Sequence, residues 1–117
     1  MPKTVIHLFH DDVDSLTLGS RVPQRIHEVA ADHDVTVEVF CFGPAQRSLA
    51  ASGSTAEQTF NRQIDELVAS GVRVGACVNA ARADGAEQAL EQRGLVLRVA
   101  RDEFLRFTLE GATVVTF

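Results

Sequence analysis

The residues of this chain best suited to covalent chemistry are its two cysteines, Cys41 and Cys77. Cys77 stands near the end of an apolar run, residues 72–78, which predicts a buried strand, and Asn79 and the start of a predicted helix follow it. In an open parallel sheet, ligands bind beyond the carboxyl ends of the strands, so Cys77 and Asn79 belong to a candidate site. A nearby helix N-terminus also favours the thiolate, which is the reactive form of cysteine. The alternative is that Cys77 is a small buried hydrophobe, and the sequence leaves both interpretations open.

Cys41 falls in another predicted strand, residues 35–42, and alternates onto the same face as three valines of that strand. This pattern favours a buried apolar role for Cys41. The strand ends at Gly43 and Pro44, which are typical of a turn. If this strand lies next to that of Cys77, the two sulfur atoms lie on the same rim of the sheet, so a shared site remains an alternative.

A polar cluster follows the first predicted strand, residues 4–9, and contains His10, Asp11, Asp12 and Asp14. Imidazole and carboxylate groups are ligands for divalent metals, but the cluster is more typical of a solvated acidic loop, and we predict no metal site. His10 and Cys77 both end parallel strands on one rim. A nucleophile pair formed by these two side chains is therefore conceivable.

Length and composition indicate one globular domain, residues 1–117, with 45% hydrophobic and 23% charged residues. The net charge of -5 and the scattered basic residues disfavour a nucleic-acid partner. No apolar run is long enough to span a bilayer, and the N-terminus does not resemble a signal peptide, so we expect no membrane partner and a cytoplasmic location. The glycine-rich nucleotide and phosphate loops are missing from the sequence, and we expect no cofactor.

Hydrophobic periodicity predicts alternating strands and helices, which is typical of an α/β fold with about five parallel strands and helices on both faces. Ser20 is the expected cap of the first helix, with Pro23 in its first turn, and Thr55 with Gln58 would form a capping box for a later helix. The predicted strands are residues 4–9, 35–42, 72–78, 95–99 and 113–117, and the predicted helices are residues 20–31, 45–50, 55–70, 86–92 and 101–109.

Across nearly its whole length the chain resembles the DsrE/DsrF-like family of intracellular sulfur-oxidation and sulfur-relay proteins. The resemblance rests on residues 7–10, on residues 37–44, on residues 104–117 and above all on residues 67–79, which end in Gly-Val-Arg-Val-Gly-Ala-Cys-Val-Asn. Members often have His before the Gly-Pro turn, where this chain has Cys41 and Phe42. The resemblance implies a three-layer α/β/α domain with strand order 4-3-2-1-5, assembled as a homotrimer or homohexamer, in which Cys77 corresponds to the cysteine that holds a persulfide.

We therefore take Cys77 as the candidate catalytic residue and Asn79, His10, Gly43, Pro44 and Cys41 as candidate binding residues. Three functions remain open at this point. In the first, Cys77 carries sulfane sulfur between donor and acceptor proteins, which would make the protein a sulfurtransferase. In the second, the protein is an oligomeric module that binds a small ligand. In the third, it is a structural or regulatory assembly protein. A carrier needs a reachable, reactive thiol, a binding module needs only an open pocket, and a structural protein needs neither.

Overall fold

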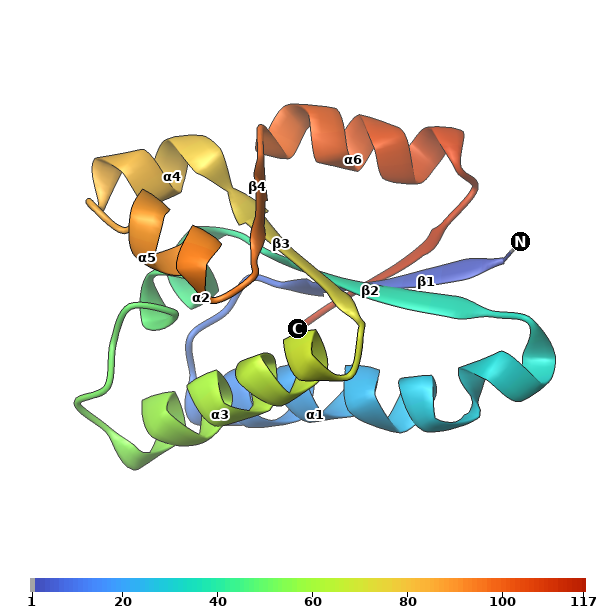
Figure 1. Cartoon of the computed structure of the whole chain (residues 1–117), viewed down its shortest axis with the longest axis horizontal. Coiled ribbons are helices and arrows are strands. Elements are labelled where there is room, and N and C mark those ends of the chain that lie inside the picture. The colour runs from blue at the N-terminus through green and yellow to red at the C-terminus, as the bar shows by residue number, and fades with distance from the viewer. Residues whose placement is uncertain (1) are drawn as a thin grey trace.

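A computed structural model describes residues 2–117 as one parallel five-stranded sheet in the order β4-β3-β2-β1-β5 (Figure 1). The predicted fold class and strand order are confirmed. The strands are β1 (Lys3–Leu8), β2 (Thr36–Cys41), β3 (Arg73–Cys77), β4 (Val96–Arg98) and β5 (Thr113–Thr116). The helices are α1 (Val13–Ala30), the 3-10 turn η1 (Ala31–His33), α2 (Gly43–Ser48), α3 (Thr55–Ala69), α4 (Val78–Ala83), α5 (Glu87–Gln92) and α6 (Ala100–Leu109).

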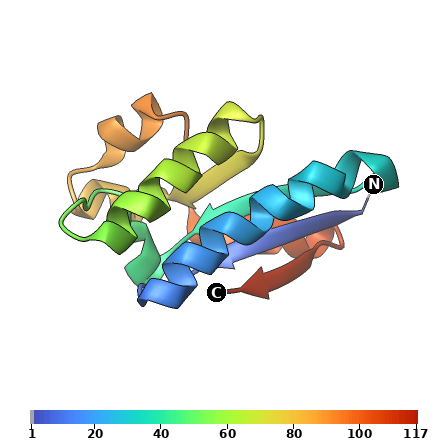
Figure 2. The ribbon, with the colours of Figure 1, turned by 90° about the horizontal axis from the view of Figure 1, so that it is seen from below.

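The helices lie on both sides of the sheet and complete three layers. Helices α1 and α3 lie side by side against one face (Figure 2), and α6 covers the other face. The short helices α4 and α5 pack against each other and against β4 at the edge of the sheet. Within the described residues, 2–117, no helix is both long enough and apolar enough to cross a membrane.

The larger core lies between the sheet and the α1/α3 layer. The helical spacing of Phe60, Ile64, Leu67 and Val68 predicts one apolar stripe on α3. The first three are fully buried, and Val68 is partly buried against the same core. They meet the side chains of β1 and β2 that point to this face, Ile6 and Val39 among them. Burial of side chains of this size stabilises the fold by about 1.5–3 kcal/mol each.

The smaller core, on the α6 face, is aromatic. Phe40 and Phe107 are each 1% exposed, and their rings pack edge to face with centroids 6.0 Å apart. Phe40 pairs in register with Gly75 of β3, and a Cβ at Gly75 would lie only 3.1 Å from the Phe40 ring and 3.3 Å from the carbonyl oxygen of Val96. Gly75 therefore leaves the room that the Phe40 ring occupies. The sequence predicts that the phenylalanines lie in the core or at a subunit interface, and Phe40 and Phe107 lie in the core.

The start of the first helix was predicted wrongly. Helix α1 begins at Val13, and its cap is Asp12, whose carboxylate accepts hydrogen bonds from the backbone N–H of Ser15 at 3.1 Å and from the Ser15 hydroxyl at 2.7 Å. Ser20 lies inside the helix, where its hydroxyl donates to the Leu16 carbonyl at 2.7 Å, and Pro23 lies inside the helix as well. The prediction missed this cap because Asp12 belongs to the acidic cluster that was interpreted as a solvated loop.

Two other local predictions also differ from the structure. The capping box of α3 is formed by Ser54 with Glu57, one residue before the predicted pair of Thr55 and Gln58. The spacing of Phe104, Leu105 and Thr108 predicts one common face for α6, but Leu105 is 57% exposed and the helix buries Glu103 instead. Glu103 can be buried because Arg73 and Arg106 bond its carboxylate, at 2.9 and 2.8 Å.

Candidate functional site

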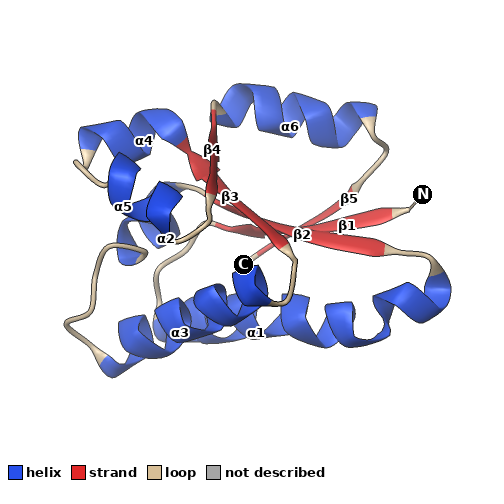
Figure 3. Ribbon diagram, in the orientation of Figure 1, coloured by secondary structure: helices blue, strands red, loops and turns tan. Residues whose placement is uncertain are grey.

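Cys77 is the last residue of β3 and the cap residue of α4, at the junction of strand and helix (Figure 3). The residue is 5% exposed and packs with the aromatic core of the α6 face. It also lines an open depression of about 600 Å³ at the carboxyl rim of the sheet. The depression is an opening through which a molecule can reach Cys77.

The depression has an apolar floor and a polar edge. Phe42, Val99 and Ala100 line it beside Cys77, while Asn79 and the exposed side chain of Arg101 provide its polar groups. Of the predicted binding residues, Asn79 is the one that lines this depression together with Cys77. Arg101 was not predicted as part of the site, because its position depends on how the start of α6 lies over the end of β3.

Gln46 holds the backbone of Cys77 from the neighbouring helix α2. Its Nε2 donates to the Cys77 carbonyl oxygen at 2.7 Å, and the Cys77 N–H donates to its Oε1 at 3.0 Å. Gln46 is 3% exposed, so both hydrogen bonds are shielded from water. No pattern in the sequence pointed to Gln46, which lies 31 positions before its partner.

Cys41 lies at the same rim as Cys77 but on the opposite face of the sheet. In the parallel pairing of β2 with β3, Cys41 is opposite Ala76, and both point into the core under α1 and α3. Cys77 is one residue further and points to the α6 face. Burial raises the pKa of the Cys41 thiol to about 12, outweighing the nearby Arg93 charge, and the residue is 0% exposed. The apolar role is confirmed for Cys41, and a site shared with Cys77 is wrong.

The other predicted binding residues lie outside the depression. His10 is exposed beyond the end of β1, which β2 separates from β3, and within residues 2–117 no hydrogen bond joins His10 to Cys77. Gly43 and Pro44 form the first turn of α2. Gly43 has a φ of +61°, and a Cβ there would collide with the Phe9 ring. Both residues therefore belong to the start of α2, the helix that carries Gln46.

The acidic cluster after β1 has a structural role at the start of α1. The Ser15 hydroxyl and N–H, bonded to the Asp12 carboxylate, hold the pKa of that group below its ordinary value. Among the residues that the structure describes, no three His, Cys, Asp or Glu side chains gather closely enough to hold a metal ion. The geometry at this end of β1 is that of a helix cap.

A family model places the chain among known proteins. The model described as "DsrE/DsrF-like family" matches residues 5–117, which is nearly the whole chain. The chain belongs to the DsrE/DsrF-like family. No curated protein matches this DsrE/DsrF-like chain.

Three solved structures are similar to this DsrE/DsrF-like protein over almost its full length. A conserved protein of unknown function from Bacteroides thetaiotaomicron, BT1422, has a TM-score of 0.74 and 16% identity, covering 99% of this chain and 94% of that chain. MTH1491 from Methanobacterium thermoautotrophicum, also of unknown function, has a TM-score of 0.71 and 24% identity, with both chains fully covered. The ychN protein from E. coli has a TM-score of 0.64 and 17% identity, covering 99% and 97%. These similarities establish the shared fold.

Proposed function

We propose that Cys77 carries sulfane sulfur as a persulfide within a sulfur relay. The observation that carries this proposal is the contrast between the two thiols of the chain. Cys77 lines an open depression, whereas Cys41 is completely buried and its pKa is raised to about 12. Membership of the DsrE/DsrF-like family supports the same role.

The proposed chemistry is an exchange that needs no external oxidant. The Cys77 thiolate attacks the terminal sulfur of a donor persulfide, a new S–S bond forms on Cys77, and the donor leaves as its thiolate. An acceptor thiolate then attacks the outer sulfur, and Cys77 leaves as a thiolate. The apolar floor beside Cys77 slows hydrolysis and side reactions of the bound persulfide by limiting access of water.

Mass spectrometry after treatment with glutathione persulfide tests the role of Cys77. We expect one added sulfur atom in the wild type and in Cys41→Ser, and none in Cys77→Ser. Uptake that persists in Cys77→Ser and disappears in Cys41→Ser would refute the assignment. Circular dichroism of both variants controls for loss of the fold, since both residues are buried.

A second candidate function is the binding of a small molecule, with Cys77 as one wall of the pocket. The volume of the depression, about 600 Å³, and its apolar floor favour this candidate. Cys77→Ser separates the two: a carrier loses sulfur uptake, whereas a binding module keeps its affinity for a ligand.

We also propose that the protein assembles as a homo-oligomer, a trimer or a hexamer. Exposed apolar side chains gather on α6 and the edge strand β5, where Leu109 is 78% exposed and Val114 and Val115 are each 42% exposed. Light scattering at micromolar concentration tests the assembly, and a monomeric mass would refute it. If α6 forms the contact between subunits, Leu109→Arg or Leu109→Lys should lower the mass of the assembly measured by light scattering.

A further inference from the structure

A groove of about 640 Å³ crosses the sheet at the rim opposite to Cys77. It runs over the amino ends of three neighbouring strands, where Lys3 begins β1, Thr36 begins β2 and Arg73 begins β3. Cys77 ends β3, so the length of that strand separates the groove from the candidate sulfur site. The two openings share no lining residue.

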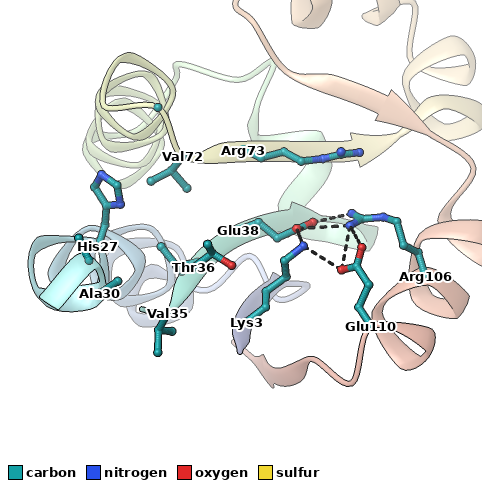
Figure 4. Close-up of a pocket in the computed structure, with 13 residues that line it drawn as sticks. Lys3, His27, Ala30, Val35, Thr36, Glu38, Val72, Arg73, Arg106 and Glu110 are labelled. Atoms are coloured by element: carbon teal, nitrogen blue, oxygen red, sulfur yellow. Dashed lines mark hydrogen bonds and ion pairs between the residues drawn. The ribbon is translucent and has the colours of Figure 1, made fainter. Parts of the chain in front are cut away.

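The groove has an apolar end and a charged end (Figure 4). The mainly apolar end lies between the last turn of α1 and the start of β3, and Ala30, Val35, Val37 and Val72 line it together with His27. The charged end lies toward α6, and its lining side chains are Lys3, Glu38, Arg73, Arg106 and Glu110. A pocket with this division suits a molecule that has an apolar body and a polar head.

At the charged end, cations lie closer to the opening than most of the carboxylates. The side chains of Glu38 and Glu103 are each 6% exposed, whereas those of Arg73 and Arg106 are 38% and 26% exposed. Glu38 is bonded by Lys3 at 2.8 Å and by Arg106 at 2.6 Å. The buried carboxylates are therefore already satisfied, and both arginines line the groove.

Arg73 has hydrogen-bond donors that nothing in residues 2–117 satisfies. Its Nη2 donates to Glu103 at 2.9 Å, its Nη1 makes no hydrogen bond, and its Nε is shielded from water without any acceptor. A guanidinium group has five N–H donors and binds carboxylates strongly. Glu103 thus occupies only part of the Arg73 guanidinium, and Nη1 is left as a donor for a second acceptor in the groove.

We propose that this groove binds a small amphipathic monocarboxylate, with its carboxylate at Arg73 and its apolar chain against Val35, Val37 and Val72. The volume lies within the ordinary range of small-molecule sites, about 300–1,000 Å³. One negative charge fits better than two, because the Glu38 and Glu110 carboxylates also line the groove and repel a dianion such as phosphate. The site is independent of the sulfur chemistry proposed for Cys77.

Titration with octanoate, followed by methyl NMR and calorimetry, tests the site in the full-length protein. We expect saturable shifts at the methyl groups of Val35 and Val72 and none at Val99, which lines the Cys77 depression. Octanamide, which has the same chain but no charge, should bind at least about tenfold more weakly, because it lacks the charge-assisted hydrogen bonds to Arg73. Arg73→Gln should weaken octanoate binding by the same factor and leave octanamide binding unchanged.

Arg101→Gln is the matched control, since Arg101 is an exposed arginine that does not line the groove, and it should bind octanoate like the wild type. Cys77→Ser should also bind octanoate like the wild type. Octanoate binding therefore tests the groove whether or not Cys77 carries sulfur. If Arg73→Gln does not fold, the methyl shifts of the wild-type protein still show whether octanoate binds at Val35 and Val72 or at Val99. Absence of binding, equal affinity for octanamide, equal binding by a folded Arg73→Gln, or shifts centred on Val99 would each overturn the proposal.

Discussion

The side-chain amide of Gln46 bonds both backbone groups of Cys77, donating to its carbonyl at 2.7 Å and accepting from its N–H at 3.0 Å. Strand β2 pairs with β3 only as far as Cys41 and Ala76, so it offers no partner to Cys77. The Gln46 amide takes the place of that missing strand and satisfies groups that would otherwise be buried without partners. The position of the candidate thiol is thereby tied to α2.

Gln46→Leu should destabilise the protein and loosen the site. It leaves a buried donor and a buried acceptor unpaired, which costs about 2 kcal/mol or more of the free energy of unfolding. Urea denaturation measures the loss, and alkylation of Cys77 should become faster in the native variant. Gln88→Leu, on the exposed side of α5, is the control and should change stability by less than about 0.5 kcal/mol. A Gln46→Leu protein as stable as this control would contradict the role of the amide.

Alkylation should distinguish the two cysteines of the native protein. Iodoacetamide at pH 8 should label Cys77 and spare Cys41, because Cys41 is 0% exposed and burial raises its pKa to about 12. Peptide mapping should therefore find one label per chain before denaturation and two after it. Cys77→Ser should stay unlabelled until urea is added. Early labelling of Cys41 would show that the core under α1 and α3 opens more readily than its packing indicates.

Acid should destabilise the protein through Glu38. Burial disfavours the ionised carboxylate, but hydrogen bonds from Arg106 and Lys3 outweigh this, and the pKa of Glu38 lies below its ordinary value of 4.5. The folded state then binds this proton less readily than the unfolded state. The contribution of Glu38 is therefore complete above about pH 4.5 and is lost as the pH falls through the folded-state pKa.

Chemical denaturation between pH 7 and pH 3 measures the contribution of Glu38. Glu38→Gln should be less stable than the wild type at pH 7 by about 1–3 kcal/mol, because Arg106 and Lys3 lose a charged partner, and the difference should shrink toward pH 3. Glu91→Gln, an exposed control, should follow the wild-type curve. A difference that stays constant across the pH range would assign the loss to packing rather than to ionisation.

Gly43→Ala should be costly although the change is a single methyl group. Gly43 has a φ of +61°, and the new Cβ would meet the Phe9 ring, so we expect a loss of about 1–3 kcal/mol. Gly53→Ala is the matched control, since its Cβ would have only one neighbour, Glu57 Oε1 at 3.7 Å, and its stability should change by less than about 1 kcal/mol. Equal melting temperatures for the two variants would show that α2 adjusts to the methyl group without strain.

The sequence by itself determined the alternation of strands and helices and the place of Cys77, although it misplaced the caps of α1 and α3. The alternation of apolar runs predicted a parallel α/β sheet, the helical spacing of Phe60, Ile64 and Leu67 predicted the buried stripe of α3, and the apolar run before Asn79 placed Cys77 at the end of a strand. These signals are local, because periodicity and capping depend on residues a few positions apart.

The tertiary structure decided which of these side chains meet. Cys41 and Cys77 lie on opposite faces because Cys41 pairs with Ala76 and side chains alternate along each strand. Gln46 reaches Cys77 across 31 positions, and Arg106 reaches Glu38 across 68 positions, so no local pattern marks either contact. Buried polar groups such as Gln46, Glu38 and Glu103 are stable only beside partners that the packing of distant elements brings to them, and that packing is a property of the folded chain as a whole.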